Sequence, residues 1–436
     1  MGLKPVKVGI CGLGTVGSGT FNVLKRNEKE ISRRAGRVIR VEEIGARREN
    51  SNCDTKGIQT TSDILAVAMN PEIDIVVELI GGYEKALELV LTAIEHGKHV
   101  VTANKALIAE HGNEIFEAAQ RKNVMVAFEA SVAGGIPIVK AIREGLAANS
   151  INWLAGIING TGNFILTEMR DKGRSFDEVL AEAQELGYAE ADPTFDVEGI
   201  DAAHKLTILA SLAYGVPLQF SKAYTEGISK ITTDDVNYAE ELGYRIKHLG
   251  ISRRTEEGIE LRVHPTLIPE KRLIANVDGV MNAVVVDADA VGPTLYYGAG
   301  AGSEPTASAV IADLVDVVRT MTADRDNRVP HLAFQPTRLS DTPILPMEQV
   351  KTAYYLRMSA VDHPGVLAEV TRILADQGVS IDSILQKSTH KNLVPVIILT
   401  HQVQEKQMNS AIQQIEALSD ISGDVTRIRV EQLDAN

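Results

Sequence analysis

Apolar and polar positions alternate at the start of the chain and then change to a helical spacing. Residues 6–11, VKVGIC, place apolar side chains at every second position, as in a strand, and a helical pattern follows the next glycines. The succession of strand and helix returns at residues 73–82 with 84–96, at 99–105 with 106–121, and again from 123. Strands that alternate with helices predict an α/β fold with a doubly wound, Rossmann-type parallel sheet.

The pattern changes from about residue 150. Residues 151–169 predict a strand, a turn rich in glycine and asparagine, and a helix, and residues 260–290 predict further strands. After the proline-containing segment RLSDTPILPMEQ, the tail predicts a ferredoxin-like βαββαβ module. We therefore expect a nucleotide-binding domain at residues 1–135 plus about 305–340, and a mixed α/β substrate and dimerisation domain at residues 136–304. A linker at residues 338–350 and a regulatory domain at residues 351–436 should follow.

Composition and charge narrow the class of protein. Of 436 residues, 44% are hydrophobic and 23% charged, which is typical of a folded chain with two or three cores. The formal net charge of −14 argues against nucleic acid or an anionic membrane as a partner, because both attract basic surfaces. The start has no signal-peptide pattern, and no apolar run reaches the ~18 residues of a membrane span, so we expect a cytoplasmic protein.

The first turn carries the pattern Gly12-x-Gly14-x-x-Gly17 between a predicted strand and a predicted helix. In a dinucleotide site the first glycine makes the tight turn, the second lets the pyrophosphate approach, and the third lets helix and strand pack closely. The alternative is an ordinary glycine turn. The position at the start of the alternating pattern favours an NAD(P) site, with the phosphates at the helix N-terminus.

The end of the second predicted strand carries Arg47 and Arg48, where an NAD site commonly has an acidic residue for the ribose 2′-hydroxyl. Two guanidinium groups suit a 2′-phosphate, so we expect NADP to be preferred, with NAD as the alternative. A solvated basic loop is the other explanation. Lys105 follows another strand, and Gly300 and Gly302 precede a helix near Pro305; each could face the cofactor or lie in an ordinary loop.

An acidic stretch, GYAEADPTFDVEGIDAAHK, spans residues 187–205. Asp196 is a candidate N-cap of the helix that follows, and Asp201 and Lys205 lie four positions apart on one helix face. By spacing alone this pair is best explained as a surface ion pair worth under about 1 kcal/mol. The acids lack the spacing of a calcium loop, and His204 points to another face of the helix.

These motifs together resemble one family. The glycine turn, TANKAL, GGIP, NGTGNFIL and the acidic stretch are similar to homoserine dehydrogenases over roughly residues 4–340. The resemblance implies NAD(P)-dependent interconversion of L-homoserine and L-aspartate 4-semialdehyde, on the route to threonine, methionine and isoleucine. It also moves the Asp201–Lys205 pair from the surface to the active site.

The resemblance assigns roles to individual residues. It implies Lys205 as the catalytic lysine, Asp201 as its partner, Lys105 near cofactor and substrate, and Glu190 as the substrate anchor. It adds a monovalent cation, expected to be Na+, held mostly by backbone carbonyls at Glu129, Val132, Gly134 and Ile136. Beside the glycines and arginines named above, it places at the cofactor Thr15, Val16, Gly187 and Gly302.

The tail segment VDHPGVLAEVTRILADQGVSIDSI resembles ACT domains, which sense amino acids. We expect L-threonine to act there as a feedback effector, between paired domains; a simple dimerisation module is the alternative. The resemblance to the dehydrogenases further implies a homo-dimer or homo-tetramer.

Two other functions fit parts of the sequence. Aspartate-semialdehyde dehydrogenase shares the scaffold but needs a cysteine nucleophile, and Cys11 and Cys53 lie within and after the nucleotide motif. A non-catalytic regulator that senses NADP and amino acids would make the set of lysine, aspartate and glutamate incidental.

Overall fold

The computed structural model describes residues 4–48, 50–324, 327–387 and 393–434. The chain divides into two compact units, each built from three stretches. The first unit comprises Met1–Gly160, Asp201–Ala223 and Val280–Thr342. The second comprises Thr161–Ile200, Tyr224–Gly279 and Pro343–Asn436.

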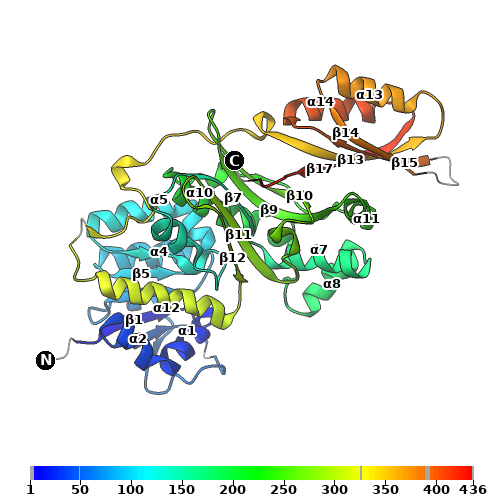
Figure 1. Cartoon of the computed structure of the whole chain (residues 1–436). Helices are drawn as coiled ribbons and strands as arrows, with labels where there is room; N and C mark the ends of the chain where they lie inside the picture. Colours follow the sequence, from blue (N-terminus) through cyan, green and yellow to red (C-terminus); the bar gives the residue numbers. More distant parts are fainter. Residues whose placement is uncertain (1–3, 49, 325–326, 388–392, 435–436) are drawn as a thin grey trace. The chain divides into compact units, whose positions relative to one another are not determined.

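The first unit contains a parallel six-stranded sheet in the order β3-β2-β1-β4-β5-β6, which confirms the Rossmann-type fold (Figure 1). Its strands are β1 (Val6–Cys11), β2 (Ile39–Gly45), β3 (Gln59–Thr61), β4 (Ile75–Glu78), β5 (His99–Thr102) and β6 (Val126–Ala127). Every residue of β4 and β5 is buried, because helices cover both faces of such a sheet. The carboxyl ends of the strands therefore form the edge at which a ligand can bind.

The helices of this sheet are α1 (Thr15–Arg26), α2 (Glu28–Ala35), α3 (Ile64–Met69), α4 (Glu84–Glu95), α5 (Lys105–Lys122) and α12 (Ser303–Thr320). Helix α12 returns from late in the sequence to lie beside α1 (Figure 1). Its apolar face, with Val310, Leu314 and Val317, is buried in one cluster with Val6, Val8 and other residues of the strands. The helix predicted to begin near Pro305 thus begins two residues earlier.

The rest of the first unit contains the short helix α6 (Ile138–Lys140), an antiparallel group of three strands and a long helix. The strands lie in the order β12-β11-β7, with β7 at Ile151–Ile157, β11 at Met281–Ala288 and β12 at Gly292–Ala299. The helix α10 (Ile200–Tyr214) is buried along nearly its whole length. Because α10 carries Asp201 and Lys205, this pair does not lie on the surface, where its spacing alone had placed it.

The second unit combines helices with a mixed sheet in the order β9-β10-β17-β13-β15-β14. Its strands are β8 (Tyr224–Thr225), β9 (Tyr244–Arg254), β10 (Ile259–Pro269), β13 (Lys351–Val361), β14 (Ile381–Gln386), β15 (Leu393–Thr400), β16 (Val403–Gln404) and β17 (Ile421–Val430). Its helices are α7 (Gly160–Lys172), α8 (Phe176–Glu185), α9 (Thr194–Val197), α11 (Thr233–Glu241), α13 (Val366–Asp376) and α14 (Glu405–Glu416).

The C-terminal module, from Lys351 onward, has the predicted βαββαβ order, with the short β16 added before α14. Successive residues of β13 point to opposite faces of its sheet. Tyr354, Leu356 and Met358 pack beneath α13 and α14, which lie together on one face (Figure 1). Tyr355 on the other face joins a cluster with residues of α7 and α11. Both faces of the module are therefore covered.

Strand β17 joins the C-terminal module to the preceding sheet. It pairs antiparallel with β13, and its last residues pair parallel with β10, Arg429 with Thr266 and Val430 with Leu267. The module therefore continues the hydrogen-bonded sheet of the second unit, which the proline-containing segment before it did not indicate.

The start of the acidic stretch differs from its prediction. Asp196 lies inside the short helix α9, whose N-cap position is Pro193, so the expectation that Asp196 caps the following helix is wrong. A second short helix was not visible in the periodicity, because four residues span only one turn. Among the residues that the structure describes, each helix is too short or too polar to span a membrane.

Candidate active site

The glycine turn has the geometry that a pyrophosphate requires. Gly12 has φ of 101°, and a Cβ there would lie 2.4 Å from the carbonyl oxygen of Leu79. A Cβ at Gly17 would lie 2.0 Å from the carbonyl oxygen of Gly12. The space around Gly14, by contrast, is open for 4 Å. The first and third glycines thus allow tight packing, and the second leaves room for a ligand at the N-terminus of α1.

The loop before α12 lies directly against this turn. Ser303 Oγ donates a hydrogen bond to the carbonyl oxygen of Thr15 at 2.8 Å. Gly302 has φ of 132° and precedes the first turn of α12. The loop is therefore held beside Thr15 and Val16, where the sequence predicts the cofactor, and does not act as a loose connection.

Arg47 and Arg48 follow the end of β2 and line a cavity of about 180 Å³ with Leu13, Thr60 and Ser62. The glutamates within the strand are engaged elsewhere: Glu43 accepts hydrogen bonds from Gln59 and Asn70, and Glu42 pairs with Lys7. The cavity beyond β2 therefore presents guanidinium and hydroxyl groups, which can donate to a phosphate.

A charged cluster lies at the junction of α5, α10 and the segment after β7. Lys105 Nζ, at the start of α5, is 3.0 Å from Asp201 Oδ1. Lys205 Nζ is 2.6 Å from Asp201 Oδ2, with a side chain that is 12% exposed. Lys205 also donates to the carbonyl oxygen of Ile158 at 2.7 Å. One carboxylate thus holds two ammonium groups, one on each oxygen.

The surface ion pair expected from spacing alone is wrong, because the Asp201 side chain is only 4% exposed. Its burial raises the carboxyl pKa, but the Lys205 and Lys105 ammonium groups more than compensate and hold the pKa of Asp201 well below its usual range. Asp201 is therefore a permanent anion that fixes the two lysines.

His204 lies beside this cluster but is part of another one. Its ring stacks on Phe220 with centroids 4.0 Å apart, and its Nε2 is 3.1 Å from Glu110 Oε1. Burial lowers the pKa of His204 despite the carboxylate. These contacts, with Phe220 and Glu110, give His204 a structural role apart from the Asp201–Lys205 pair.

Family models match three successive stretches of the chain. The model of the homoserine dehydrogenase NAD binding domain matches residues 12–129, that of homoserine dehydrogenase matches 137–315, and that of the ACT domain matches 354–420. A homoserine dehydrogenase of Pseudomonas aeruginosa is 72% identical over 433 residues, which cover 99% of this chain and 100% of that protein. The chain belongs to the homoserine dehydrogenase family.

Solved structures agree with this membership. The crystal structure of a homoserine dehydrogenase from Thiobacillus denitrificans has a TM-score of 0.95 and 67% identity, and covers 99% of this chain and 100% of that one. A hyperthermophilic archaeal homoserine dehydrogenase in complex with NADPH has a TM-score of 0.62 and 25% identity, and covers 72% of this chain and 97% of that one. The NAD-binding domain of the family implies a nicotinamide cofactor.

The residues that the family resemblance assigned fall in both units. The first unit brings together Lys105, Asp201 and Lys205, and it separately brings the glycine turn next to Gly302. Gly187 and Glu190 belong to the second unit, in the exposed segment between α8 and α9. Their approach to cofactor and substrate stays a prediction.

The loop expected to hold a cation begins at Glu129. The Glu129 carboxylate accepts the backbone N–H groups of Val139 and Lys140 at 2.9 and 2.7 Å, and burial raises its pKa to about 7. Ala133 and Gly134 have φ of 54° and 42°, so the backbone there is left-handed and the carbonyl groups do not alternate in direction as in an extended strand. The Glu129 side chain thus binds the backbone. Of the carbonyl oxygens expected as ligands, those of Glu129 and Ile136 also accept backbone N–H groups, from Val132 at 3.3 Å and from Ile138 at 2.8 Å.

Carbonyl oxygens are suitable ligands for a hard monovalent cation, because such ions prefer uncharged and carboxylate oxygens. Within the described part of the chain, His, Cys, Asp and Glu side chains form no group of three that could hold a metal ion. A cation at Glu129, Val132, Gly134 and Ile136 would therefore rely on the backbone, as the resemblance implies, and it stays a prediction.

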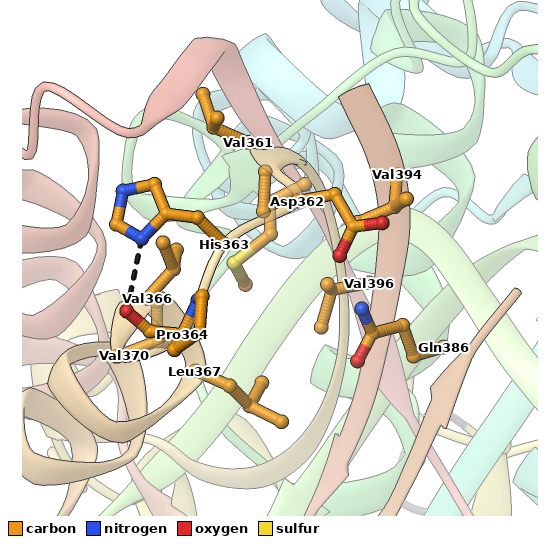
Figure 2. A pocket seen from close by; sticks show the side chains of 13 residues that line it. Val361, Asp362, His363, Pro364, Val366, Leu367, Val370, Gln386, Val394 and Val396 are labelled. Atoms are coloured by element: carbon orange, nitrogen blue, oxygen red, sulfur yellow. Dashed lines mark hydrogen bonds between the residues drawn. The ribbon is translucent and has the colours of Figure 1, made fainter. Parts of the chain in front are cut away.

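The ACT module of this family member contains a second cavity, of about 370 Å³. The turn between β13 and α13 forms one side with Asp362 and His363, and Val394 and Val396 of β15 form its apolar floor. Figure 2 shows Asp362 and Gln386 beside Val396, with His363 on the far side of the cavity. The pocket thus offers a carboxylate and an amide above an apolar surface.

Sequence reasoning missed the two residues that complete the charged cluster. The Ile158 carbonyl leaves no trace in side-chain identity. Asn159, which donates to Asp201 Oδ2 at 2.8 Å, lies within the NGTGNFIL motif, but nothing in its spacing from Asp201 suggests contact.

Proposed function

We propose that this protein is a homoserine dehydrogenase that interconverts L-homoserine and L-aspartate 4-semialdehyde with NADP. The supporting observation is the buried Asp201, which holds Lys205 and Lys105 on its two oxygens. The nicotinamide, when bound, supplies or accepts the hydride. What the chain must add is a proton at the substrate oxygen and a positive charge to stabilise it.

Lys205 suits both tasks. When the aldehyde is reduced, negative charge grows on its oxygen, and the Lys205 ammonium can stabilise this charge and then donate the proton. Hydrogen bonds from Lys205 Nζ to Asp201 and to the Ile158 carbonyl fix the direction of the ammonium. In the oxidation direction a neutral Lys205 accepts the hydroxyl proton, so oxidation is favoured at alkaline pH. Glu190 is proposed to bind the substrate ammonium.

The alternatives are less well supported. Cys11 ends β1 and is buried, and this burial raises the pKa of its thiol far above the ordinary value, which suits packing rather than nucleophilic attack. A non-catalytic sensor gives no role to two ammonium groups held on one buried carboxylate. The test is homoserine-dependent reduction of NADP by the pure protein, repeated with sodium replaced by tetramethylammonium. The absence of turnover in either medium would favour the sensor.

We expect Arg47 and Arg48 to decide the cofactor preference. Replacing both by serine removes two charge-assisted donors, so the KM for NADP should rise roughly 10- to 100-fold, while the KM for NAD changes little. Steady-state kinetics with each cofactor measures the ratio. Arg40→Ser, at an exposed position of β2, is the matched control. Equal effects on both cofactors would place the 2′-phosphate elsewhere.

We propose that the ACT cavity binds L-threonine as a feedback inhibitor. Asp362 is placed to accept the ligand ammonium, Gln386 can bond its carboxylate or hydroxyl, and Val394 and Val396 can contact its methyl group. Asp362→Asn keeps the shape of the pocket but removes the charge. We expect the inhibition constant for threonine to rise at least roughly tenfold, with kcat unchanged.

The control is Asp382→Asn, an exposed position of β14 outside the cavity. Equal inhibition of wild type and Asp362→Asn would place the effector elsewhere, and a wild type indifferent to threonine would leave the module as a dimerisation element. Deletion of the module is a poor test, since it removes β17 from beside β10.

We propose that the protein forms a homo-oligomer in which the exposed face of β12 is part of the contact between subunits. Pro293, Leu295 and Tyr297 alternate along this strand with exposed side chains, and Tyr297 is 58% exposed. An apolar stripe of this kind is typical of a contact between protein surfaces. Sedimentation of the pure protein as a monomer would contradict it.

A further inference from the structure

The two-residue connection between β7 and α7 holds the charged cluster. Ile158 and Asn159 follow the end of β7, and α7 begins at Gly160. A Cβ at Gly160 would lie 2.8 Å from the Val280 carbonyl oxygen, so the backbone is closely packed there. This packed connection contributes the Ile158 carbonyl to Lys205 and the Asn159 amide to Asp201.

Asn159 and Lys205 share one oxygen of Asp201. The Asn159 Nδ2 donates to Asp201 Oδ2 at 2.8 Å, and Lys205 Nζ donates to the same atom at 2.6 Å. Lys105 lies at the other oxygen. Asn159 is buried, as is Asp201. The neutral Asn159 amide therefore fixes the plane of the Asp201 carboxylate, whose two oxygens each contact one lysine ammonium group.

We propose that Asn159 is a positioning residue that orients Asp201 and, by competing for Oδ2, weakens the hold of this carboxylate on the Lys205 proton. The inference rests on the proposed function, because it describes how the proton donor of that reaction is tuned. Nothing in the family resemblance assigned a role to this side chain.

Charged and titratable side chains face Asp201 from two helices. Lys205 faces it from α10 and Lys105 from α5; His204 lies next to it on α10, with Glu110 of α5 as the partner of His204. A hydrogen bond donated to a carboxylate oxygen lowers the basicity of that oxygen. Lys205 must release its proton when homoserine is oxidised, so a weaker attraction to Oδ2 favours catalysis.

The decisive variants are Asn159→Ala and Asn159→Asp. The alanine removes the donor, and the aspartate has nearly the same shape but brings an acceptor and a negative charge. We expect Asn159→Ala to lower kcat for homoserine oxidation roughly tenfold or more. The ascending limb of the kcat profile, on which Lys205 loses its proton, should move upward by about half to one pH unit. The limb of Asn159→Asp should move further, and the KM for NADP should stay unchanged.

The matched control is Asn163→Ala in the same motif. Asn163 is also buried, but its amide donates to the carbonyls of Val277 and Gly279 and not to Asp201. This variant should lower the melting temperature and leave the pH limb in place. A limb of Asn159→Ala that coincides with that of the wild type would overturn the inference, whatever the loss of kcat.

A second measurement separates this inference from the proposed function. In the full-length protein, NMR titration of lysines labelled with 13C at Cε follows Lys205 without turnover, with Lys205→Arg used for assignment. We expect the titration midpoint of Lys205 to rise in Asn159→Ala. An inactive wild type that shows this rise would refute the proposed function and keep the inference; an unchanged midpoint would refute the inference even in an active enzyme.

Discussion

Lys205→Ala lowers kcat for homoserine oxidation and for aldehyde reduction by roughly a thousandfold or more, because one change removes both the proton donor and the positive charge at the reacting oxygen. The KM for NADP should change little, since the glycine turn and the arginine cavity, where the cofactor is expected to bind, are built from residues other than Lys205. Steady-state kinetics in both directions, with cofactor binding followed by fluorescence, measures the two effects separately.

Two further variants make this result specific. Lys205→Arg keeps a positive charge near Asp201 but cannot give up a proton near neutral pH, so it should remain severely impaired. Lys222→Ala changes an exposed lysine whose Nζ bonds Gln219, and it should retain the activity of the wild type. If Lys205→Ala kept near-normal kcat, the proton would have to come from another group, and Lys105 would be the first to test.

Arg262→Met should cause the largest loss of stability, about 3–5 kcal/mol, because it breaks a buried ion network. Arg262 Nη2 lies 2.8 Å from Glu260 Oε2 and 2.6 Å from Glu431 Oε1, and its Nη1 is 2.7 Å from His264 Nε2. Arg262 is 1% exposed, and both glutamates are buried. Methionine fills much of the volume but leaves two carboxylates away from water without the guanidinium that they share. Urea unfolding followed by circular dichroism measures the loss.

The pH dependence of this loss has a defined sign. In the wild type, burial raises the pKa of Glu431, but Arg262 and Arg253 more than compensate, so its pKa is lowered and its contribution to stability is present above the ordinary value of 4.5 and lost as the pH falls. Without Arg262 the Glu431 carboxylate should bind a proton more tightly in the folded state. The difference from wild type should therefore be smaller at pH 5 than at pH 8.

The control for this prediction is Arg33→Met, in which the ion pair with Glu30 lies on the surface of α2 and the arginine side chain is 81% exposed. It should leave the unfolding curve unchanged, since exposed pairs contribute little. A loss in Arg262→Met no greater than in this control would mean that the buried network is no more stabilising than a surface pair.

Local features of the sequence were enough for much of the fold. The alternation of Val6, Val8 and Ile10 before Gly12 encodes the first strand and turn, because strand period and glycine conformation depend on neighbouring residues only. The order of strands and helices in the C-terminal module was predictable for the same reason. The candidate N-cap Asp196 failed, since a helix of one turn has no periodicity to detect.

Burial and partners could not be predicted from these features. The spacing of Asp201 and Lys205 is the same for a pair on the surface and for one in an active site, and the family resemblance was needed to prefer the second. Contact of Asp201 with Asn159 and Lys105, 42 and 96 positions earlier, depends on how β7, α5 and α10 pack. No local pattern records such packing.

The sequence by itself therefore determined the parallel sheet, the glycine turn, the arginines that follow β2 and the family to which the chain belongs. Only the tertiary structure decided that Asp201 is buried with two lysines and an asparagine, and that β17 continues the sheet beside β10. The division has one physical reason: backbone periodicity is set by near neighbours, whereas desolvation of a charge and pairing of distant strands are set by residues far apart in the chain.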